Sequence, residues 1–396
     1  MKTHRLMDTI LKFSAAIVLS GLMVFNACTI QPPLHLPTQD ILTELPIVET
    51  RLETIWNFDT LDWEKTWYYG WDEEDIRRWG PLEYPKPEYY EIRRYFTGDV
   101  PHAPHTNVSS TFVNNTKFRE RVPFGWHDML VWSDFGFLPF GQAVIIDEKS
   151  DLDNVMATTS TSTMRFSNGN RSTANEYDHF NNPEIFYRGY LDGFYVSRDT
   201  ADYDYFDPIE RLWVLKQKVD LVPAVYIYLV QVILYNNRGR VIGLNDFCAV
   251  NGLSRITNLT TGHTGLEDVS VIFDMRMKNQ IRKDTVMVDI IGGELTTFGL
   301  CDQGPYQPTR GRTYDGHMGN IHNHFTLNAS FSNYTDSIYV YDVTDQFQSQ
   351  CHGGIITVEI DVDTLNIPVS PIPDHPGSSF DPLVQDYSDE EYEIQL

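Results

Sequence analysis

Short segments in which apolar and polar residues alternate recur along this chain, and they limit its fold more than any other feature. The clearest lie within residues 48–54, 269–277, 325–331 and 356–362. Alternation with a period of two is typical of a β-strand that buries one face. No strand–helix–strand rhythm accompanies these segments, so we predict no parallel sheet. The sequence therefore predicts an all-β protein with two tandem antiparallel β-sandwich domains.

The boundary between the two domains is predicted from a change in composition. Residues 199–208 form an acidic, aromatic stretch that ends in proline, and longer apolar runs follow it. Such punctuation is typical of a connection between packed units. We therefore expect an N-terminal domain over residues 47–207, a C-terminal domain over residues 208–368, and an acidic tail or strand over residues 369–396.

The first 27 residues have the pattern of a secretory signal. Basic residues precede an apolar run, and a small residue then precedes Cys28. This arrangement resembles bacterial lipoprotein signals, which are cut just before a cysteine that receives lipid. We predict that residues 1–27 are removed and that lipid on Cys28 holds the protein to a membrane; an ordinary secretory signal cut elsewhere is the alternative. The proline-rich residues 28–46 predict an extended tether.

Composition and motifs exclude several classes of function. The chain has 55 acidic and 30 basic residues, a formal charge of −25, so we expect no binding to nucleic acid. It contains no Gly-x-Ser-x-Gly, no His-Glu-x-x-His and no phosphate-binding glycine loop, so we predict no enzyme and no cofactor. His317, His322 and His324 lie close together in sequence. We expect polar surface residues there and no metal site.

Three cysteines follow Cys28, and none has the spacing of a metal site. In an oxidising location one pair could form a disulfide. Cys301 and Cys351 both lie next to glycine in loop-like sequence, which favours them as that pair. Three unpaired thiols, at least some of them buried, is the alternative.

Five of the eight tryptophans lie between Trp56 and Trp79. One interpretation is an aromatic platform formed by Trp63, Trp67 and Trp71, on which a sugar ring or a protein partner packs. The interpretation that we favour is a local core that packs an inserted loop against the sandwich. Exposed, coplanar rings would indicate the platform, and buried rings the local core.

Several short motifs, in a shared order, resemble those of one protein family. The chain resembles the lipid-anchored fimbrillin-like proteins of Bacteroidota, both their fimbrial anchor or minor-subunit lipoproteins and a related uncharacterised domain family. The likeness spans residues 47–396, and residues 56–79 depart from it as an insertion. The motifs are VPFGWHD at 122–128, the strand pair at 219–235, GGELTTFG at 292–299, YDVTDQ at 341–346 and the acidic segment 379–396.

The resemblance implies a fold, a location and a partner. It implies two transthyretin-like, Greek-key sandwiches in tandem, in a lipoprotein of the outer membrane displayed at the cell surface. It also implies fimbrial subunits as partners, joined by exchange of β-strands in an adhesive fibre. The alternative function is a carbohydrate-binding surface lipoprotein of a glycan-uptake system.

Overall fold

The computed structural model describes residues 42, 44–54, 66–82, 84–101, 106–133, 143–147, 151–162, 179–305, 316 and 321–369. The predicted signal, Cys28, nearly all of the tether, Trp63, and the tail beyond residue 369 lie outside the described residues. The strands are β1 (Ile47–Thr54), β2 (Tyr90–Gly98), β3 (Thr106–Val113), β4 (Lys117–Arg121), β5 (Gly125–Ser133), β6 (Val144–Ile146), β7 (Met156–Thr159), β8 (His179–Asn181), β9 (Tyr187–Val196), β10 (Tyr205–Asp207), β11 (Leu212–Pro223), β12 (Tyr226–Tyr235), β13 (Val241–Leu244), β14 (Cys248–Ser254), β15 (Ile256–Asn258), β16 (Asp268–Phe273), β17 (Arg276–Lys283), β18 (Val286–Thr297), β19 (His324–Phe331), β20 (Asp336–Asp342) and β21 (Gly354–Asp361). The helices are α3 (Glu73–Trp79), α4 (Thr344–Ser349) and the short 3-10 turns η2 (Leu152–Asn154), η4 (Thr200–Asp202) and η5 (Val362–Thr364).

The N-terminal half forms one folded-over sheet. Its strands run in the order β3-β2-β5-β9-β11-β1-β4, with β10 added to β11. Strands β9 and β11 pair only at two residues, Val222 with Arg188 and Pro223 with Tyr187. The two parts of the sheet can therefore face each other, and Val48 of β1 and Val131 of β5 share one buried core.

The boundary between the sandwiches lies later than the sequence predicted. Strand β11 pairs in parallel with the whole of β1, from Ile47 with Val214 to Thr54 with Leu221. It therefore belongs to the first sandwich, and the chain passes to the second only after Pro223. The acidic, aromatic stretch 199–208 is not the connection between the sandwiches. It forms η4 and the β10 hairpin inside the first sandwich.

The second sandwich packs two sheets around the largest core. The four-stranded sheet has the order β17-β18-β12-β21, and the six-stranded sheet has the order β13-β19-β14-β16-β8, with β20 on the far side of β19. Val230 and Val232 of β12 lie in one core with Phe325 and Leu327 of β19. Strand β8, from the N-terminal half of the sequence, completes the second sheet by pairing with β16.

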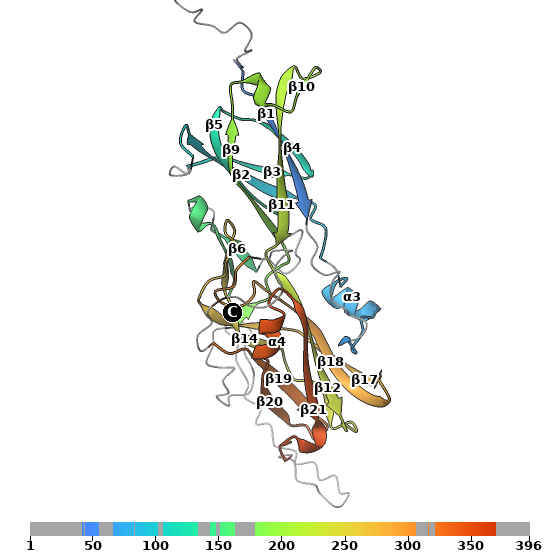
Figure 1. Ribbon diagram of the computed structural model, residues 1–396. Coiled ribbons are helices and arrows are strands. Elements are labelled where there is room, and N and C mark those ends of the chain that lie inside the picture. The colour runs from blue at the N-terminus through green and yellow to red at the C-terminus, as the bar shows by residue number, and fades with distance from the viewer. Residues whose placement is uncertain are drawn as a thin grey trace, which may run out of the picture.

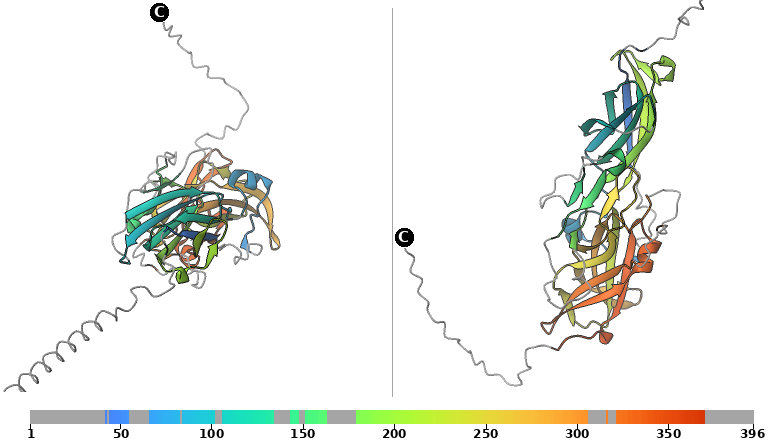
Figure 2. Two further views of the ribbon diagram at one scale, coloured as in Figure 1. Left: turned by 90° about the horizontal axis from the view of Figure 1, so that it is seen from above. Right: turned by 90° about the vertical axis from the view of Figure 1, so that its left-hand side faces the viewer.

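A small third sheet joins the two sandwiches. Strands β6 and β7 come from the first half of the sequence and β15 from the second, in the order β15-β7-β6. Its core contains Trp132 of the first sandwich and Phe298 of the second. The two sandwiches are therefore interlocked, and together they form an elongated body (Figure 2).

The all-β prediction is confirmed, with two corrections. Three pairs of strands are parallel, namely β1 with β11, β12 with β21 and β8 with β16. These partners are far apart in sequence and are connected through other strands of the sandwiches. Their pairing therefore leaves no strand–helix–strand pattern in the sequence. Residues 269–277, one of the alternating segments, are divided between the end of β16 and the start of β17, which belong to different sheets.

The two ends of the described chain lie at opposite poles of the body. The chain enters the first sandwich through Leu42 and β1, at the top of Figure 1. It leaves the second sandwich through η5, at the bottom of the same view. We call this second end the distal pole.

Candidate functional site

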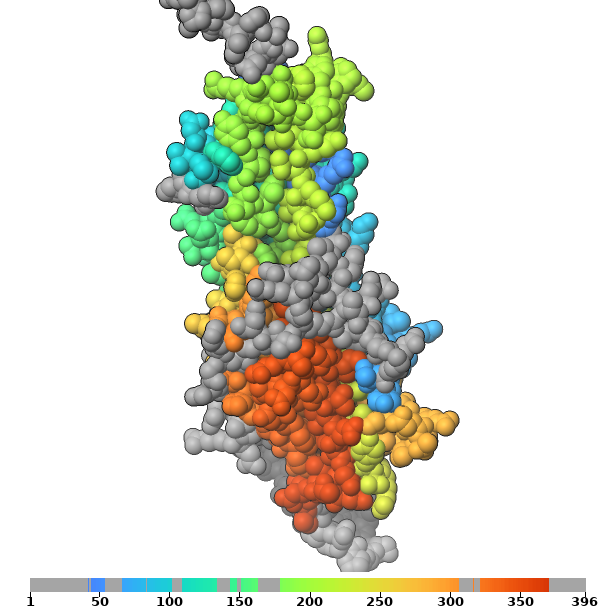
Figure 3. All heavy atoms as spheres, viewed as in Figure 1, coloured from blue at the N-terminus to red at the C-terminus, as the bar shows by residue number. Residues whose placement is uncertain are grey.

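Residues 66–82, which we call the strap, connect two strands of the first sandwich but pack against the second. The strap contains α3, which lies beside β17 and β18 in Figure 1 and forms part of the surface next to β17 in Figure 3. It covers the outer face of the four-stranded sheet. Strand β12 is therefore buried on both faces, with Ile227 and Leu229 facing the strap side. The strap overlaps the segment predicted as an insertion, residues 56–79, over residues 66–79.

Tryptophan and tyrosine rings of the strap pack on one another and on the sheet. Trp67 is 7% exposed and Tyr69 is 2% exposed, whereas Trp71 is half-buried. The rings of Trp67 and Trp71 are tilted by 47°. Tyr69 lies directly over Gly292 of β18, where a Cβ atom would come within 2.4 Å of the ring. Trp67 and Trp71 therefore do not form an exposed, coplanar pair; with Trp63 outside the described residues, the platform of all three rings stays a prediction.

A single buried amide fixes the position of the strap. The side chain of Gln231 on β12 donates to the carbonyl of Thr66 at 2.7 Å and to the hydroxyl of Thr357 at 2.9 Å. Its oxygen accepts from the backbone N–H groups of Tyr68, at 3.0 Å, and Tyr69, at 3.4 Å. All four hydrogen-bonding positions of the amide are used, so a buried polar residue is fully satisfied.

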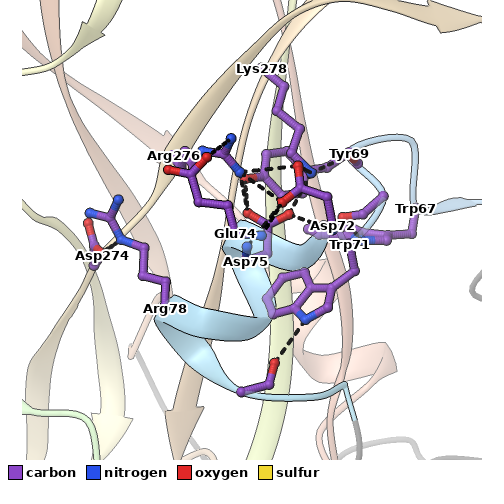
Figure 4. Close-up of polar contacts among 12 residues, drawn as sticks. Trp67, Tyr69, Trp71, Asp72, Glu74, Asp75, Arg78, Asp274, Arg276 and Lys278 are labelled. Carbon is purple, nitrogen blue, oxygen red and sulfur yellow. Dashed lines mark hydrogen bonds and ion pairs between the residues drawn. The ribbon is translucent and has the colours of Figure 1, made fainter.

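Ion pairs hold α3 to β17 (Figure 4). The carboxylate of Asp75 is fully buried and accepts from Arg276 at 2.8 Å, from Lys278 at 2.5 Å and from the Tyr69 hydroxyl at 2.8 Å. The hydrogen bond from the backbone N–H of Asp75, together with Lys278, holds the pKa of Asp72 below its usual range. Asp72 caps the helix and Asp75 returns a bond to the Asp72 backbone, a reciprocal capping box. These groups satisfy one another, so the cluster acts as a clamp.

A second buried contact joins the two sandwiches. Arg188 of β9 donates to the carbonyl oxygens of Leu259 and Thr260, both at 3.1 Å, and of Thr261 at 3.4 Å. Burial lowers the pKa of this guanidinium from its usual value. Backbone carbonyl oxygens surround the cation and bear the partial negative charge that stabilises it. Arg188 therefore fixes how the second sandwich meets the first.

The free edge of β21 is closed by two glutamine side chains. Gln350 accepts from the N–H of Ile355 at 2.9 Å and donates to its carbonyl at 3.0 Å. Gln346, one helical turn earlier on α4, does the same for Thr357 at 2.8 and 2.9 Å. The amides take the place of a neighbouring strand. The sheet edges in the described part of the chain include β3, β4, β13, β17, β20 and β21.

The structure also locates the predicted cysteines and histidines. Cys248, Cys301 and Cys351 are all buried, and the pairing of Cys301 with Cys351 stays a prediction. Burial raises the pKa of Cys301 to about 12. His322 and His324 lie with ring centres 6.1 Å apart. Within the described ranges, no group of three His, Cys, Asp or Glu side chains is placed to hold a metal ion.

Several residues that fix the architecture were not predicted from the sequence. Gln231 is the one polar side chain in an otherwise apolar and aromatic run of ten residues, and that interruption was a usable signal. Arg188 lies among aromatic residues and has no sequence signal that separates it from a surface arginine. Gln346 and Gln350 are four residues apart, but their role depends on a strand that follows the helix.

Comparisons with known proteins concern the fold. The sequence matches no protein-family model and no curated protein. A solved candidate adhesin from Bacteroides ovatus is similar with a TM-score of 0.46 and 14% identity, over 81% of this chain and 93% of that one. The fimbrial anchor protein Mfa2 from Porphyromonas gingivalis gives 0.36 and 8%, over 79% and 90%. A fimbrial assembly protein from Parabacteroides distasonis gives 0.31 and 10%, over 80% and 91%.

At these identities and TM-scores the similarity carries no statement about what the chain binds. Within the described ranges, no helix has the length and apolar character needed to cross a membrane. The solved structures to which this chain is similar are adhesin and fimbrial proteins.

Proposed function

We propose that this protein is a lipid-anchored cell-surface protein that serves as a fimbrial anchor or assembly subunit. The observation that carries the proposal is the placement of the two ends of the described chain at opposite poles (Figure 1). Lipid on Cys28 would hold the first sandwich close to the outer membrane through the tether. The distal pole would then face away from the membrane, where further subunits could join.

Interlocking of the two sandwiches suits a load-bearing connector. The small third sheet, the strap and Arg188 each join parts of the sequence that lie in different sandwiches. A force applied between the poles would have to break these contacts together. Loosely linked domains would instead rotate about their linker.

Contacts with neighbouring subunits are proposed to run through sheet edges. An edge strand presents a row of backbone N–H and C=O groups that another strand can pair with. The edges of β13, β17 and β20 all belong to the second sandwich. The high negative charge of the chain, −25, would oppose unspecific association of such edges.

The family motifs support the same proposal. The YDVTDQ motif forms the end of β20 and the start of α4, and GGELTTFG forms the end of β18. Both motifs therefore lie in the second sandwich, the part of the protein through which we propose that neighbouring subunits bind.

Lipid attachment can be tested by labelling cells with an alkyne-tagged palmitate. We expect label on the wild-type protein and none on a Cys28→Ser variant, which should be found in soluble fractions. Digestion of intact cells with an added protease should remove the wild-type protein if it is displayed at the surface. Label that persists in Cys28→Ser, or protection from protease in intact cells, would contradict the proposal.

A further inference from the structure

A cavity of about 630 Å³ lies at the distal pole, between the two facing sheets of the second sandwich. One wall is the turn between β12 and β13 together with the start of β13, and the other is the hairpin of β17 and β18. The volume lies within the roughly 300–1,000 Å³ of ordinary ligand pockets. The cavity is therefore large enough to take a ligand.

Two side chains brace the walls of this cavity. Asn237 is 4% exposed, and its side chain donates to the carboxylate of Asp289 at 2.7 Å and to the carbonyl of Val241 at 2.9 Å. The other oxygen of Asp289 accepts from the backbone N–H of Gln280 at 2.8 Å. These hydrogen bonds connect the two walls while the cavity stays open, so the site is formed before any ligand arrives.

Two side-chain amides in the lining are available to a ligand. Strand β17 loses its register with β18 between Lys278 and Ile281, so Asn279 and Gln280 bulge out of the ladder. Both side chains are exposed, and neither has a hydrogen bond to another residue in the described ranges. Bulges re-aim side chains and are frequent next to functional sites. Each amide presents two N–H donors and one oxygen acceptor.

The charges around the cavity compensate one another. Arg240 pairs with Asp363 at 2.5 Å, and Lys283 pairs with Glu359. The charged groups in the lining and beside it include three cations and four carboxylates, namely Arg238, Arg240, Lys283, Asp289, Glu359, Asp361 and Asp363. A ligand with a strong charge of either sign would meet a like charge here, and a neutral ligand avoids that cost.

The lining also has an apolar part. Ile242 is 59% exposed, Val286 51% and Met287 57%, and the half-buried ring of Tyr235 lines the cavity as well. A saccharide matches both parts of the lining. Its hydroxyl groups donate and accept hydrogen bonds, as the amides do, and the C–H bonds of its ring pack on apolar side chains.

An extended peptide fits this cavity less well. Strand β13 has a register shift between Val241 and Gly243, and β17 has one between Lys278 and Ile281. An added strand pairs with a continuous row of backbone N–H and C=O groups. Both edges are interrupted where they border the cavity, so its contacts with a ligand come from side chains.

We propose that the distal-pole cavity binds a neutral saccharide. The amides of Asn279 and Gln280 bind its hydroxyl groups, and Val286 and Met287 pack on its ring. This binding site goes beyond the proposed anchor or assembly role and needs neither the lipid nor a neighbouring subunit. The two proposals can fail separately, because lipid labelling tests the anchor and saccharide binding tests this site.

Binding can be measured on the full-length protein with a printed array of neutral, sialylated and sulfated oligosaccharides, followed by calorimetric titration of the strongest neutral binder. We expect a Kd of about 1 mM or tighter. Asn279→Ala should weaken binding by about fivefold or more, because one hydrogen-bonding group is lost. Met287→Ser should weaken it by about threefold or more, because apolar contact is lost. Matched controls are Asn114→Ala, at an exposed asparagine between β3 and β4, and Leu266→Ser, at a leucine that is 72% exposed. Both should bind as the wild type does.

Hydrogen exchange with and without the same saccharide locates the site. We expect slower exchange of backbone amides in residues 236–242 and 279–288 when the saccharide is bound. The proposal would be overturned if the array retained no neutral oligosaccharide, if Asn279→Ala and Met287→Ser bound as tightly as the wild type, or if the protected amides lay elsewhere. Random peptides displayed on phage that bind the wild type and not these two variants would also overturn it, because the occupant would then be a polypeptide.

Discussion

The side chain of Gln231, in the middle of β12, donates a 2.7 Å hydrogen bond to the backbone carbonyl of Thr66, 165 positions earlier in the chain. This contact joins β12 of the second sandwich to the strap, which follows β1 of the first sandwich in sequence. Together with the bonds to Tyr68 and Tyr69, it sets where the strap lies. The interlocked body that we propose as a connector depends on contacts of this kind.

Replacing the Gln231 amide should release the strap. In Gln231→Leu, the N–H groups of Tyr68 and Tyr69 and the carbonyl of Thr66 lose their buried partner. We expect the free energy of unfolding to fall by about 2–4 kcal/mol and amides of residues 66–82 to exchange faster. Chemical denaturation and hydrogen exchange measure both. Gln217→Leu, at a half-buried glutamine of the first sandwich, should change stability by less than about 1 kcal/mol and leave strap exchange unaltered.

Adding one methyl group under the strap should have a similar but smaller effect. In Gly292→Ala, the new Cβ would lie 2.4 Å from the Tyr69 ring, so the ring or the strand must move. We expect a loss of about 1–3 kcal/mol. The control is Gly243→Ala, where no atom lies within 4 Å of the added group. Equal stability of the two variants would show that Tyr69 does not pack on Gly292.

Removing the Arg188 guanidinium should loosen the joint between the sandwiches. Arg188→Met leaves the carbonyl oxygens of Leu259, Thr260 and Thr261 without this donor. We expect a loss of about 3 kcal/mol, because hydrogen bonds to a charged group are lost in a buried site. We also expect a calorimetric transition that separates into two. Arg211→Met, at an exposed position of the β10–β11 hairpin, is the control and should keep a single transition. A single transition in both proteins would argue against Arg188 as the joint.

The amides on α4 should protect the edge of β21. In Gln346→Ala/Gln350→Ala, the backbone groups of Ile355 and Thr357 lose the side chains that bond to them. We expect faster exchange of these two amides and more self-association in light scattering, because an open edge can pair with another chain. Asp345→Ala, an exposed change on the same helix, should do neither. Unchanged exchange in the double variant would mean that the edge is closed by something else.

Stability should depend on pH through His127. This histidine is fully buried, its Nε2–H donates to the carbonyl of Pro123 at 2.7 Å, and Arg94 approaches its other nitrogen. Burial lowers its pKa to about 4; the positive charge of Arg94 adds to this, and the hydrogen bond to the Pro123 carbonyl and the charges of Glu120 and Asp128 oppose it. The folded protein therefore holds neutral imidazole, while the unfolded chain binds a proton below about pH 6.5.

The direction of the pH dependence follows from this difference in pKa between the folded protein and the unfolded chain. Stability contributed by neutral His127 is fully present above pH 6.5 and is lost as the pH falls towards 4, by about 3 kcal/mol in total. Denaturant titrations between pH 7.5 and pH 4.5 measure the slope. A His127→Gln variant should show a shallower slope over the same range. Parallel slopes for the two proteins would contradict the assignment.

The sequence was sufficient for local structure and insufficient for long-range connections. Alternation placed β1, β19 and β21 correctly, because this signal lies within a few residues of sequence. The parallel pairing of β1 with β11 depends on contacts across more than 160 residues, which no local pattern encodes. The apolar run that forms β12 was visible in the sequence. It could not say that a segment from the other sandwich provides the second cover.

The difference between local patterns and long-range contacts also determines how much of the candidate site could be predicted. The cluster of tryptophans was visible in sequence, but whether Trp67 faces solvent depends on the sheet beneath it. Arg276 and Lys278, on the edge strand β17, pair with Asp75 because α3 lies against that strand, a contact that no local pattern encodes. Sequence can identify such residue types, whereas their burial is a property of the folded chain.

The most direct test of the proposed function is to isolate the protein from its native outer membrane after cross-linking and to identify the chains attached to it. The account predicts a ladder of fimbrial subunits joined to the second sandwich, with cross-links near the distal pole and the edges of β13, β17 or β20. A Cys28→Ser protein should lose its attachment to the membrane. Recovery of the wild-type protein alone, or with components of a glycan-uptake system in place of fimbrial subunits, would contradict it.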